Sequence, residues 1–303
     1  GNVVSPEDIL KNYGADILRV WVAASDYAED LRIDNNILGQ HAESYRKIRN
    51  TFRFILGNLK DNYEKQKLEE LRIDEFEELE QYILHKLFII DKSVKENLKN
   101  YNLHKLYKEL LNFCTLDLSS FYFDIRKDVL YCDDLNSKKR KECVIVLNII
   151  LECLLKWFAP ILVFTTEEIY SLAGKSKNSI HEYDFTEIPK KWENNNLNNK
   201  WSKLFKIKQV ANIAIEEKRS NKEIGSSLEA ELKVITGEKN FQIMENLDLA
   251  EYFITSRAER IKSNKKDEFK IEVKKATGVK CPRCWKILKN NCPRCDLVIN
   301  KIN

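Results

Sequence analysis

The sequence predicts a mainly α-helical protein: an antiparallel helix bundle, followed by a small α+β unit and a four-cysteine knuckle. Apolar residues recur every three or four positions over long segments as far as residue 157. The period changes to two at residues 228–234 and 269–273, which indicates strands. Two CxxC pairs then follow within 15 residues, 281–295. With only 8 Gly and 5 Pro in 303 residues, a loop-rich β sandwich is disfavoured.

Two short helices are expected first. Ser5 is a good N-cap and Pro6 suits a first helical turn. Gly14 is expected to end this helix, and Asp16 to cap the next one.

Four longer amphipathic helices are expected to form the bundle. Their apolar series cover residues 37–59, 76–98, 103–125 and 143–157. The run Thr165–Glu168 resembles a capping box for one more short helix, ending at Leu172. The scattered cysteines of the apolar stretches are expected to be inert core residues; they are Cys114, Cys132, Cys143 and Cys153.

The Asn-rich stretch between Trp192 and Trp201 reads as a loop or a domain boundary. A further helix is expected after it, and then the period-two strands. We therefore expect four domains in chain order. They are an N-terminal segment with two short helices (1–35), the helix bundle (36–192), the α+β unit (193–275) and the four-cysteine knuckle (276–303).

The clustered cysteines predict a structural zinc site. Each CxxC turn presents two sulfurs on one side, and two such turns complete a tetrahedron. The expected ligands of one Zn²⁺ per chain are Cys281, Cys284, Cys292 and Cys295. Two disulfides, or a redox CxxC, are the alternatives. A segment this short cannot bury enough apolar surface to fold alone, so metal binding would supply its folding free energy.

Charge is distributed unevenly along the chain. Residues 255–303 carry 14 Lys and Arg against 5 Asp and Glu, a balance of +9, whereas the rest is slightly acidic. A basic end favours a polyanionic partner, although a lysine-rich surface gives the same count. No stretch approaches about twenty uncharged apolar residues, which argues against a membrane span. The first residues also lack the order of a signal peptide, so we expect a cytoplasmic protein.

Two sets of residues are candidate RNA contacts. In the tail, Trp285 directly follows a zinc turn, and a basic segment with an aromatic platform suits single-stranded RNA. Packing of Trp285 over the knuckle is the alternative. On the first long helix, Arg46, Arg49 and Arg53 lie one turn apart and could follow a phosphate backbone, or form a solvated helix face. The full set of tRNA-binding candidates is Arg46, Arg49, Arg53, Arg283, Trp285 and Arg294.

Catalytic signatures are missing from the sequence. It has no GxGxxG, P-loop or GxSxG motif, and its four histidines have no HExxH spacing. We assign no catalytic residue, and the chain by itself looks like a binding module.

Several stretches resemble, in one order, the C-terminal third of bacterial-type isoleucyl-tRNA synthetases, which are class I aminoacyl-tRNA synthetases. The resemblance covers nearly the whole chain. The matching stretches are Gly1–Pro6, Tyr13–Ala23, Ser44–Thr51, Ser120–Asp124, Ala159–Leu162, Ile224–Ala230 and Cys281–Trp285.

The resemblance implies a role for each part. Residues 1–35 would be the stem-contact segment after the KMSKS loop, the bundle would be the anticodon-binding domain, and the tail would close on the anticodon arm. The full enzyme would join isoleucine to tRNA(Ile) using ATP; this chain would lack its catalytic and editing domains and act as a monomer on tRNA(Ile). One departure is that the segment between the CxxC pairs is shorter than expected for the family.

Two alternatives remain open from the sequence. One is a zinc-ribbon DNA-binding module, because DNA glycosylases of the formamidopyrimidine type end in a similar finger. The other is a non-catalytic helical scaffold with a structural zinc.

Overall fold

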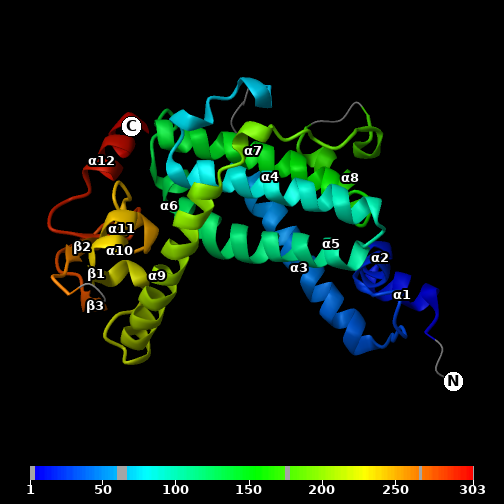
Figure 1. Ribbon diagram of the computed structural model, residues 1–303, viewed down its shortest axis with the longest axis horizontal. Helices are drawn as coiled ribbons and strands as arrows, with labels where there is room; N and C mark the ends of the chain where they lie inside the picture. Colours follow the sequence, from blue (N-terminus) through cyan, green and yellow to red (C-terminus); the bar gives the residue numbers. More distant parts are fainter. Residues whose placement is uncertain (1–3, 60–66, 175–177, 266–267, 303) are drawn as a thin grey trace. The chain divides into compact units, whose positions relative to one another are not determined.

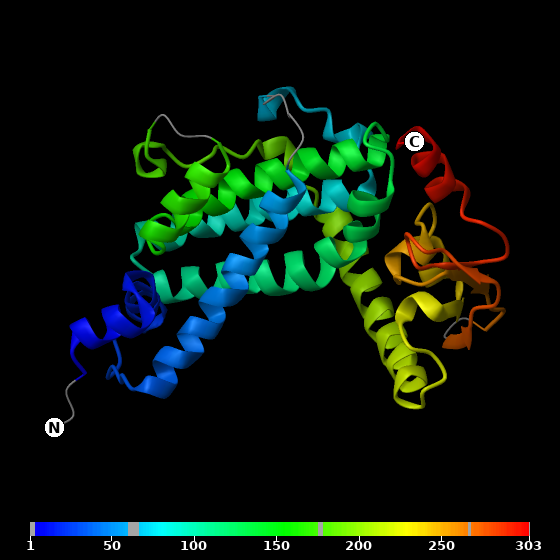
Figure 2. The same cartoon turned by 180° about the vertical axis from the view of Figure 1, so that it is seen from behind.

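The chain folds into two units. The computed structural model describes residues 4–59, 67–174, 178–265 and 268–302 (Figures 1 and 2). Unit 1 comprises Gly1–Tyr122 and Lys141–Glu193, and unit 2 comprises Phe123–Arg140 and Asn194–Asn303. The first three residues of the expected stem-contact segment lie outside the described part of the chain.

Unit 1 begins with the two expected short helices, α1 (Pro6–Tyr13) and α2 (Ala15–Ala24). The Ser5 hydroxyl accepts a hydrogen bond from the backbone N–H of Glu7, as an N-cap does. Gly14 joins the helices with φ of 85°, a conformation that glycine adopts without a steric cost.

Two expected helix caps are wrong: the capping box at Thr165–Glu168, and Asp16 as the cap of α2. Helix α8 begins at Val163 and ends at Leu172, so Thr165 lies inside it and is not its N-cap. The buried Asp16 carboxylate does not cap its own helix. It accepts hydrogen bonds from the backbone N–H and the hydroxyl of Thr165, 2.8 and 2.5 Å away, at the start of α8. A carboxylate from a distant segment therefore serves as the N-terminal cap.

The expected helix bundle is confirmed. Its helices are α3 (Asn35–Asn58), α4 (Glu78–Lys99), α5 (Leu103–Asn112) and α7 (Lys138–Phe158), which belongs to unit 1 from Lys141 onward. Figures 1 and 2 show α4, α5 and α7 running along one direction, with α3 crossing them. In the core, Phe52 meets Phe158 edge to face at 6.2 Å and Phe113 meets Trp157 at 6.4 Å. Among the described helices, none has the length and apolarity needed to cross a membrane.

The third expected helix is not a regular α-helix throughout. After α5, residues Phe113–Phe123 form a π-helix, and α6 (Asp124–Cys132) follows. The hydroxyls of Ser119 and Ser120 donate to the carbonyls five residues earlier, those of Cys114 and Thr115, at 2.8 Å each. These side chains satisfy carbonyls in the wider π geometry, which periodicity at 3.6 residues per turn does not anticipate.

Unit 2 holds a three-stranded sheet in the order β2-β1-β3. The strands are β1 (Ala230–Thr236), β2 (Arg257–Lys262) and β3 (Phe269–Lys275), so both expected strands are confirmed and β2 was missed. β1 pairs in parallel with β2 and antiparallel with β3. Helices α10 (Glu238–Ile243) and α11 (Leu249–Tyr252) form the crossover between β1 and β2.

Helix α9 (Asn195–Ser220) packs against the sheet in unit 2. Its buried face includes Leu204, Ala211 and Ile215, and the buried residues of β1 alternate along the strand. The Asn-rich stretch is therefore not a loop, but it lies at the boundary between the units, since unit 1 ends at Glu193 and unit 2 continues from Asn194. Asn194 caps the helix by accepting from the backbone N–H of Leu197 at 2.9 Å, and α9 starts at once.

Buried charges join α6 to α11 inside unit 2. Arg126 is 3% exposed, and its guanidinium lies 2.6 Å from the carboxylate of Glu251. Lys139 reaches the other oxygen of Glu251 at 2.9 Å. Removal of one partner of such a buried group leaves an uncompensated charge, so the three side chains fix α6 against α11.

Lys208 of α9 is a second buried charge in unit 2. It is 7% exposed. Its ammonium donates to the backbone carbonyl of Tyr252 and lies 4.9 Å from the centre of the aromatic ring of that tyrosine. Burial lowers the pKa of Lys208 to about 8, although nearby Asp124 acts in the opposite direction. The pKa of lysine in an unfolded chain is about 10.4.

We expect the stability of the chain to depend on this lysine above neutral pH. Between about pH 8 and 10, unfolding takes up a proton at Lys208, so the free energy of unfolding contributed by this residue rises with pH. The free energy of unfolding of Lys208→Met, measured relative to that of wild type, should therefore fall by about 2 kcal/mol between pH 7 and pH 10. Denaturant unfolding at both pH values measures this difference. Lys206→Met, at an exposed position of the same helix, is the control. If the difference between Lys208→Met and wild type changes with pH as little as that of Lys206→Met, the lowered pKa of Lys208 is contradicted.

Candidate metal centre and nucleic-acid interface

The four clustered cysteines lie on two short backbone elements of unit 2. A hairpin formed by β4 (Val279–Lys280) and β5 (Ile287–Leu288) carries Cys281 and Cys284 between its strands. The second pair, Cys292 and Cys295, sits at the start of α12 (Pro293–Ile302).

Backbone contacts shape the hairpin. The N–H of Cys281 donates to the carbonyl of Lys286 at 2.9 Å, and the N–H of Trp285 donates to the carbonyl of Cys281 at 3.0 Å. Gly278 starts the hairpin with φ of 134°, and a Cβ there would lie 2.0 Å from the carbonyl oxygen of Leu288. Only glycine fits this close approach of the two strands.

The cysteine sulfurs are arranged as a metal site requires. All four side chains are buried, and their Sγ atoms lie within 4.8 Å of one another. The Sγ atoms of Cys284 and Cys292 are 3.9 Å apart. Four sulfurs at ~2.3 Å around a tetrahedral ion are spaced by about 3.8 Å, so the cluster fits such an ion. Burial acts to raise the pKa of Cys281, but the backbone N–H groups of Cys284 and Arg283 outweigh it and bring the pKa to about 7.

The two arginines of the CxxC turns contact protein groups. Arg294 makes a bidentate pair with Asp128 of α6, at 2.7 and 2.9 Å, and reaches Asp133 at 3.0 Å. Arg283 donates to the backbone carbonyls of Cys132 and, at 3.1 Å, Tyr131. We call these contacts of Arg283 and Arg294 the arginine clamp. It occupies both guanidinium groups, so direct RNA contact by either residue stays a prediction.

The acidic partners in the clamp were not found from the sequence. Asp128 is separated from Arg294 by 166 residues, and no periodic pattern relates them. Burial acts to raise the pKa of Asp128, but Arg294 and Lys286 outweigh burial and lower it. Cys132, expected to be an inert core residue, lies beside the four-cysteine cluster, with its sulfur 3.8 Å from the carbonyl of Arg283. The only available signal was charge complementarity between the acids after residue 127 and the basic tail.

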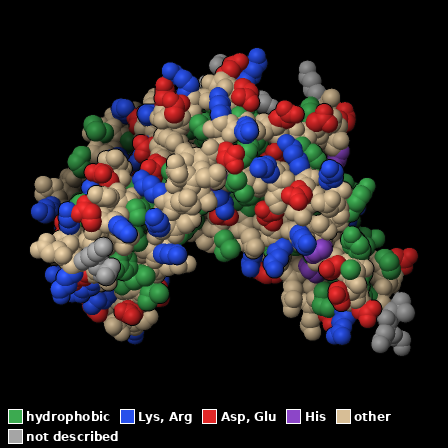
Figure 3. Space-filling view, viewed as in Figure 1, with side chains coloured by type: hydrophobic (Ala, Val, Ile, Leu, Met, Phe, Trp, Pro, Cys, Tyr) green, Lys and Arg blue, Asp and Glu red, His purple; other side chains and the backbone are tan. Residues whose placement is uncertain are grey.

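Trp285 is exposed, with 61% of its surface accessible, and so does not pack as a lid over the knuckle. Its backbone adopts φ of 64°. Lys and Arg side chains are spread over the face that carries the strands of unit 2 (Figure 3). Two lysines of the sheet are paired, Lys262 with Glu238 and Lys270 with Glu272, which reduces the excess of positive charge there.

The arginine stripe lies on α3 in unit 1. Arg46 pairs with Glu43 on the same helix, and Arg53 is exposed. Arg49 reaches Glu168 at 2.8 Å and the hydroxyl of Tyr45 at 3.1 Å. The pair is open to solvent, at 42% and 50% side-chain exposure, so an incoming phosphate could exchange with the carboxylate.

Comparison with known proteins identifies the class. Residues 80–235, half of the chain, match the model of the anticodon-binding domain of tRNA ligases. Residues 1–34 match the class I tRNA synthetases for I, L, M and V. The chain therefore belongs to the class I tRNA ligase family, through its anticodon-binding domain.

Within the family, the chain corresponds to the C-terminal portion of isoleucine–tRNA ligases. It is 58% identical over 294 residues to the isoleucine–tRNA ligase of Pelagibacter ubique, covering 97% of this chain and 32% of the relative. The ligase of Agrobacterium fabrum is 40% identical over 95% of this chain and 30% of its own length. That of Natranaerobius thermophilus is 36% identical over 100% of this chain and 35% of its own length. The chain thus spans about a third of these relatives.

A solved structure shows the same fold. The crystal structure of the ternary complex of Agrobacterium radiobacter K84 agnB2 LeuRS with tRNA and LeuAMS superposes with a TM-score of 0.50 at 14% identity. The match covers 64% of this chain and 22% of that one. The family assignment favours a tRNA ligase over the DNA-binding ribbon and the helical scaffold that the sequence had left open.

We expect the arginine clamp to stabilise the knuckle. Arg294→Ala should lower the free energy of unfolding by about 1–3 kcal/mol, because Asp128 would be left partly buried without its main partner. Arg294→Lys should restore only part of this, since an ammonium cannot form the bidentate pair. Denaturant unfolding of the metal-loaded chain measures the loss. Lys289→Ala, at an exposed position, is the control, and equal effects of the two alanine variants would contradict the clamp.

Proposed function

We propose that this chain is the part of an isoleucine–tRNA ligase that binds the anticodon arm of tRNA(Ile). The match of residues 80–235 to the anticodon-binding domain carries the proposal. The whole ligase would join isoleucine to tRNA(Ile) using ATP. The sequence of this chain contains no phosphate-binding loop, so we assign it positioning of the tRNA and no catalytic step.

We further propose that the four cysteines hold one structural Zn²⁺. Four buried sulfurs within 4.8 Å of one another support this assignment, and thiolate sets of this kind favour zinc. When bound, the ion supplies cross-linking of the hairpin and α12, with no open position for catalysis. We also propose a monomer in the cytoplasm, where thiols stay reduced, because the ligand set is complete within one chain.

We assign the RNA contacts to two kinds of residue. Arg46, Arg49 and Arg53 would bind the phosphate backbone, which supplies affinity. Trp285, which is exposed, would stack on a base. Arg283 and Arg294 would act on tRNA binding chiefly by holding the knuckle on α6 through the arginine clamp.

The metal assignment predicts one zinc per chain by elemental analysis, with Zn–S distances near ~2.3 Å by X-ray absorption. Cys292→Ser should lose the metal and unfold the segment after residue 276, because that segment has little apolar core of its own. Circular dichroism should show that the helices of unit 1 persist. Protein purified without chelator that contains clearly less than one zinc would overturn the assignment.

The phosphate-contact assignment predicts a change in salt dependence. Arg49→Ala should weaken binding by a similar factor for every RNA, and lower the slope of log affinity against log salt by about one. Glu168→Gln is the matched opposite variant: it removes the carboxylate that pairs with Arg49, so binding should strengthen. The measurement is affinity against salt for tRNA(Ile), an unrelated tRNA and duplex DNA. If both variants bind like wild type, the stripe is a solvated helix face.

A further inference from the structure

A hollow of about 440 Å³ lies in unit 1 between α2, α3 and α8. The arginine stripe reaches it through Arg49, and the side chains of Asp16, Tyr45, Thr165 and Glu168 line it as well. Helix α2 packs against both α3 and α8, so residues far apart in the sequence meet here. The hydrogen bonds among these groups determine how Arg49 is held.

Four of these side chains form one continuous chain of hydrogen bonds. The Thr165 hydroxyl lies 2.5 Å from the Asp16 carboxylate and 2.8 Å from the hydroxyl of Tyr45. The Tyr45 hydroxyl in turn lies 3.1 Å from the Arg49 guanidinium. Tyr45 and Arg49 are one turn apart on α3, a spacing at which side chains meet. The hydrogen bonds therefore connect α2 to the arginine stripe through α8.

The chemistry of the two ends fixes the direction of every hydrogen bond in this chain. A carboxylate only accepts, and a guanidinium only donates. Thr165 therefore gives its single proton to Asp16. The proton between Thr165 and Tyr45 must then come from Tyr45, which leaves lone pairs of the tyrosine oxygen for Arg49. Hydrogen bonds that run in one direction polarise one another, so the charge of Asp16 strengthens the hold of Tyr45 on Arg49.

The chain of hydrogen bonds is fixed at its buried end. Asp16 is 6% exposed and accepts the backbone N–H of Thr165 at the N-terminus of α8, where a negative charge is favoured. One turn along α2, Arg19 donates to the carbonyls of Pro160 and Ile161, at 2.7 and 2.8 Å. Asp16 and Arg19 thus hold both sides of the turn between α7 and α8.

The two protein partners of Arg49 differ in kind. Glu168 is half exposed, and its carboxylate competes with an incoming phosphate for the guanidinium. The Tyr45 hydroxyl is uncharged and belongs to the chain that ends at the buried Asp16. A phosphate can therefore replace Glu168 while Tyr45 keeps its hydrogen bond. A guanidinium that is already held in one direction loses less conformational freedom on binding.

We propose that Asp16, Thr165 and Tyr45 are positioning residues for Arg49, and that they hold its guanidinium in place while a backbone phosphate of the RNA replaces Glu168. The inference rests on the proposed phosphate contact of Arg49, and it adds the residues that set the geometry of that contact. None of the three binds the phosphate itself, and each acts through Arg49.

The test is a double-mutant cycle in the full chain loaded with zinc, with affinity for tRNA(Ile) as the measurement. Tyr45→Phe removes only the hydroxyl and should weaken binding about fivefold, the equivalent of one hydrogen bond. In an Arg49→Ala background the same change should have no further effect, because the group on which Tyr45 acts is absent. Tyr13→Phe is the control: Tyr13 lines the same hollow outside the chain of hydrogen bonds, and this variant should bind like wild type.

Thr165 supplies a second measurement. Thr165→Val keeps the backbone N–H that Asp16 accepts but removes the link to Tyr45, so it should also weaken binding, and only where Arg49 is present. Thr165→Ser keeps the hydroxyl and should bind like wild type.

A role in stability alone would weaken binding equally in both backgrounds, and that result overturns the inference. Binding by Tyr45→Phe at the level of wild type overturns it too. In both cases Arg49→Ala still binds more weakly than wild type, so the proposed phosphate contact stands. If Arg49→Ala itself binds like wild type, the proposed contact fails and the inference fails with it.

Discussion

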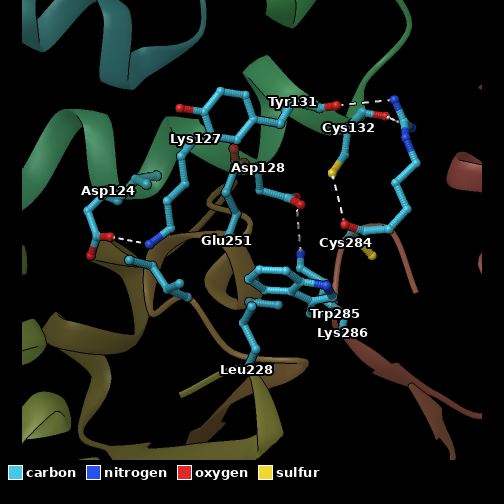
Figure 4. A pocket seen from close by; sticks show the side chains of 14 residues that line it. Asp124, Lys127, Asp128, Tyr131, Cys132, Leu228, Glu251, Cys284, Trp285 and Lys286 are labelled. Atoms are coloured by element: carbon cyan, nitrogen blue, oxygen red, sulfur yellow. Dashed lines mark hydrogen bonds and ion pairs between the residues drawn. The ribbon is translucent and has the colours of Figure 1, made fainter. Parts of the chain in front are cut away.

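The pair of Arg294 and Asp128 determines where the C-terminal segment of the chain lies. It joins residues separated by 166 positions, and it is bidentate, so it fixes orientation as well as distance. Arg283 adds a second attachment through the carbonyls at the end of α6. This attachment holds the knuckle, and Trp285 with it, beside α6 (Figure 4).

Helix α6 in turn is held by buried charges. Arg126 and Lys139 share the carboxylate of Glu251, so the N-terminal half of α6 is tied to α11 as its C-terminal end is tied to the knuckle. Replacing such groups by apolar ones is often neutral for stability, whereas removing one alone is costly. Fixing α6 between two neighbours is therefore a more direct account of these charges than added stability.

Local patterns predicted most of the fold. The bundle helices follow from apolar spacing, the strands β1 and β3 from alternation, and the cysteine cluster from the two CxxC pairs. Errors arose where a distant residue replaced a local one. Thr165 has the sequence position of a cap, but the cap of α8 comes from Asp16, 149 residues earlier. The π-helix was missed because hydroxyls, not apolar spacing, satisfy its carbonyls.

Partners from distant segments of the chain also limit what the sequence can say about the RNA-binding surface. Basic residues were chosen as RNA contacts by their charge, yet a guanidinium binds a carboxylate of its own protein as readily as a phosphate. Arg283 and Arg294 met protein groups, whereas Arg49 has an exposed partner that a phosphate can displace. Sequence counts charge but not the depth at which each pair is buried. The useful distinction is therefore between a charge whose partner is buried, which positions the structure, and one whose partner is open to solvent, which can exchange it for RNA.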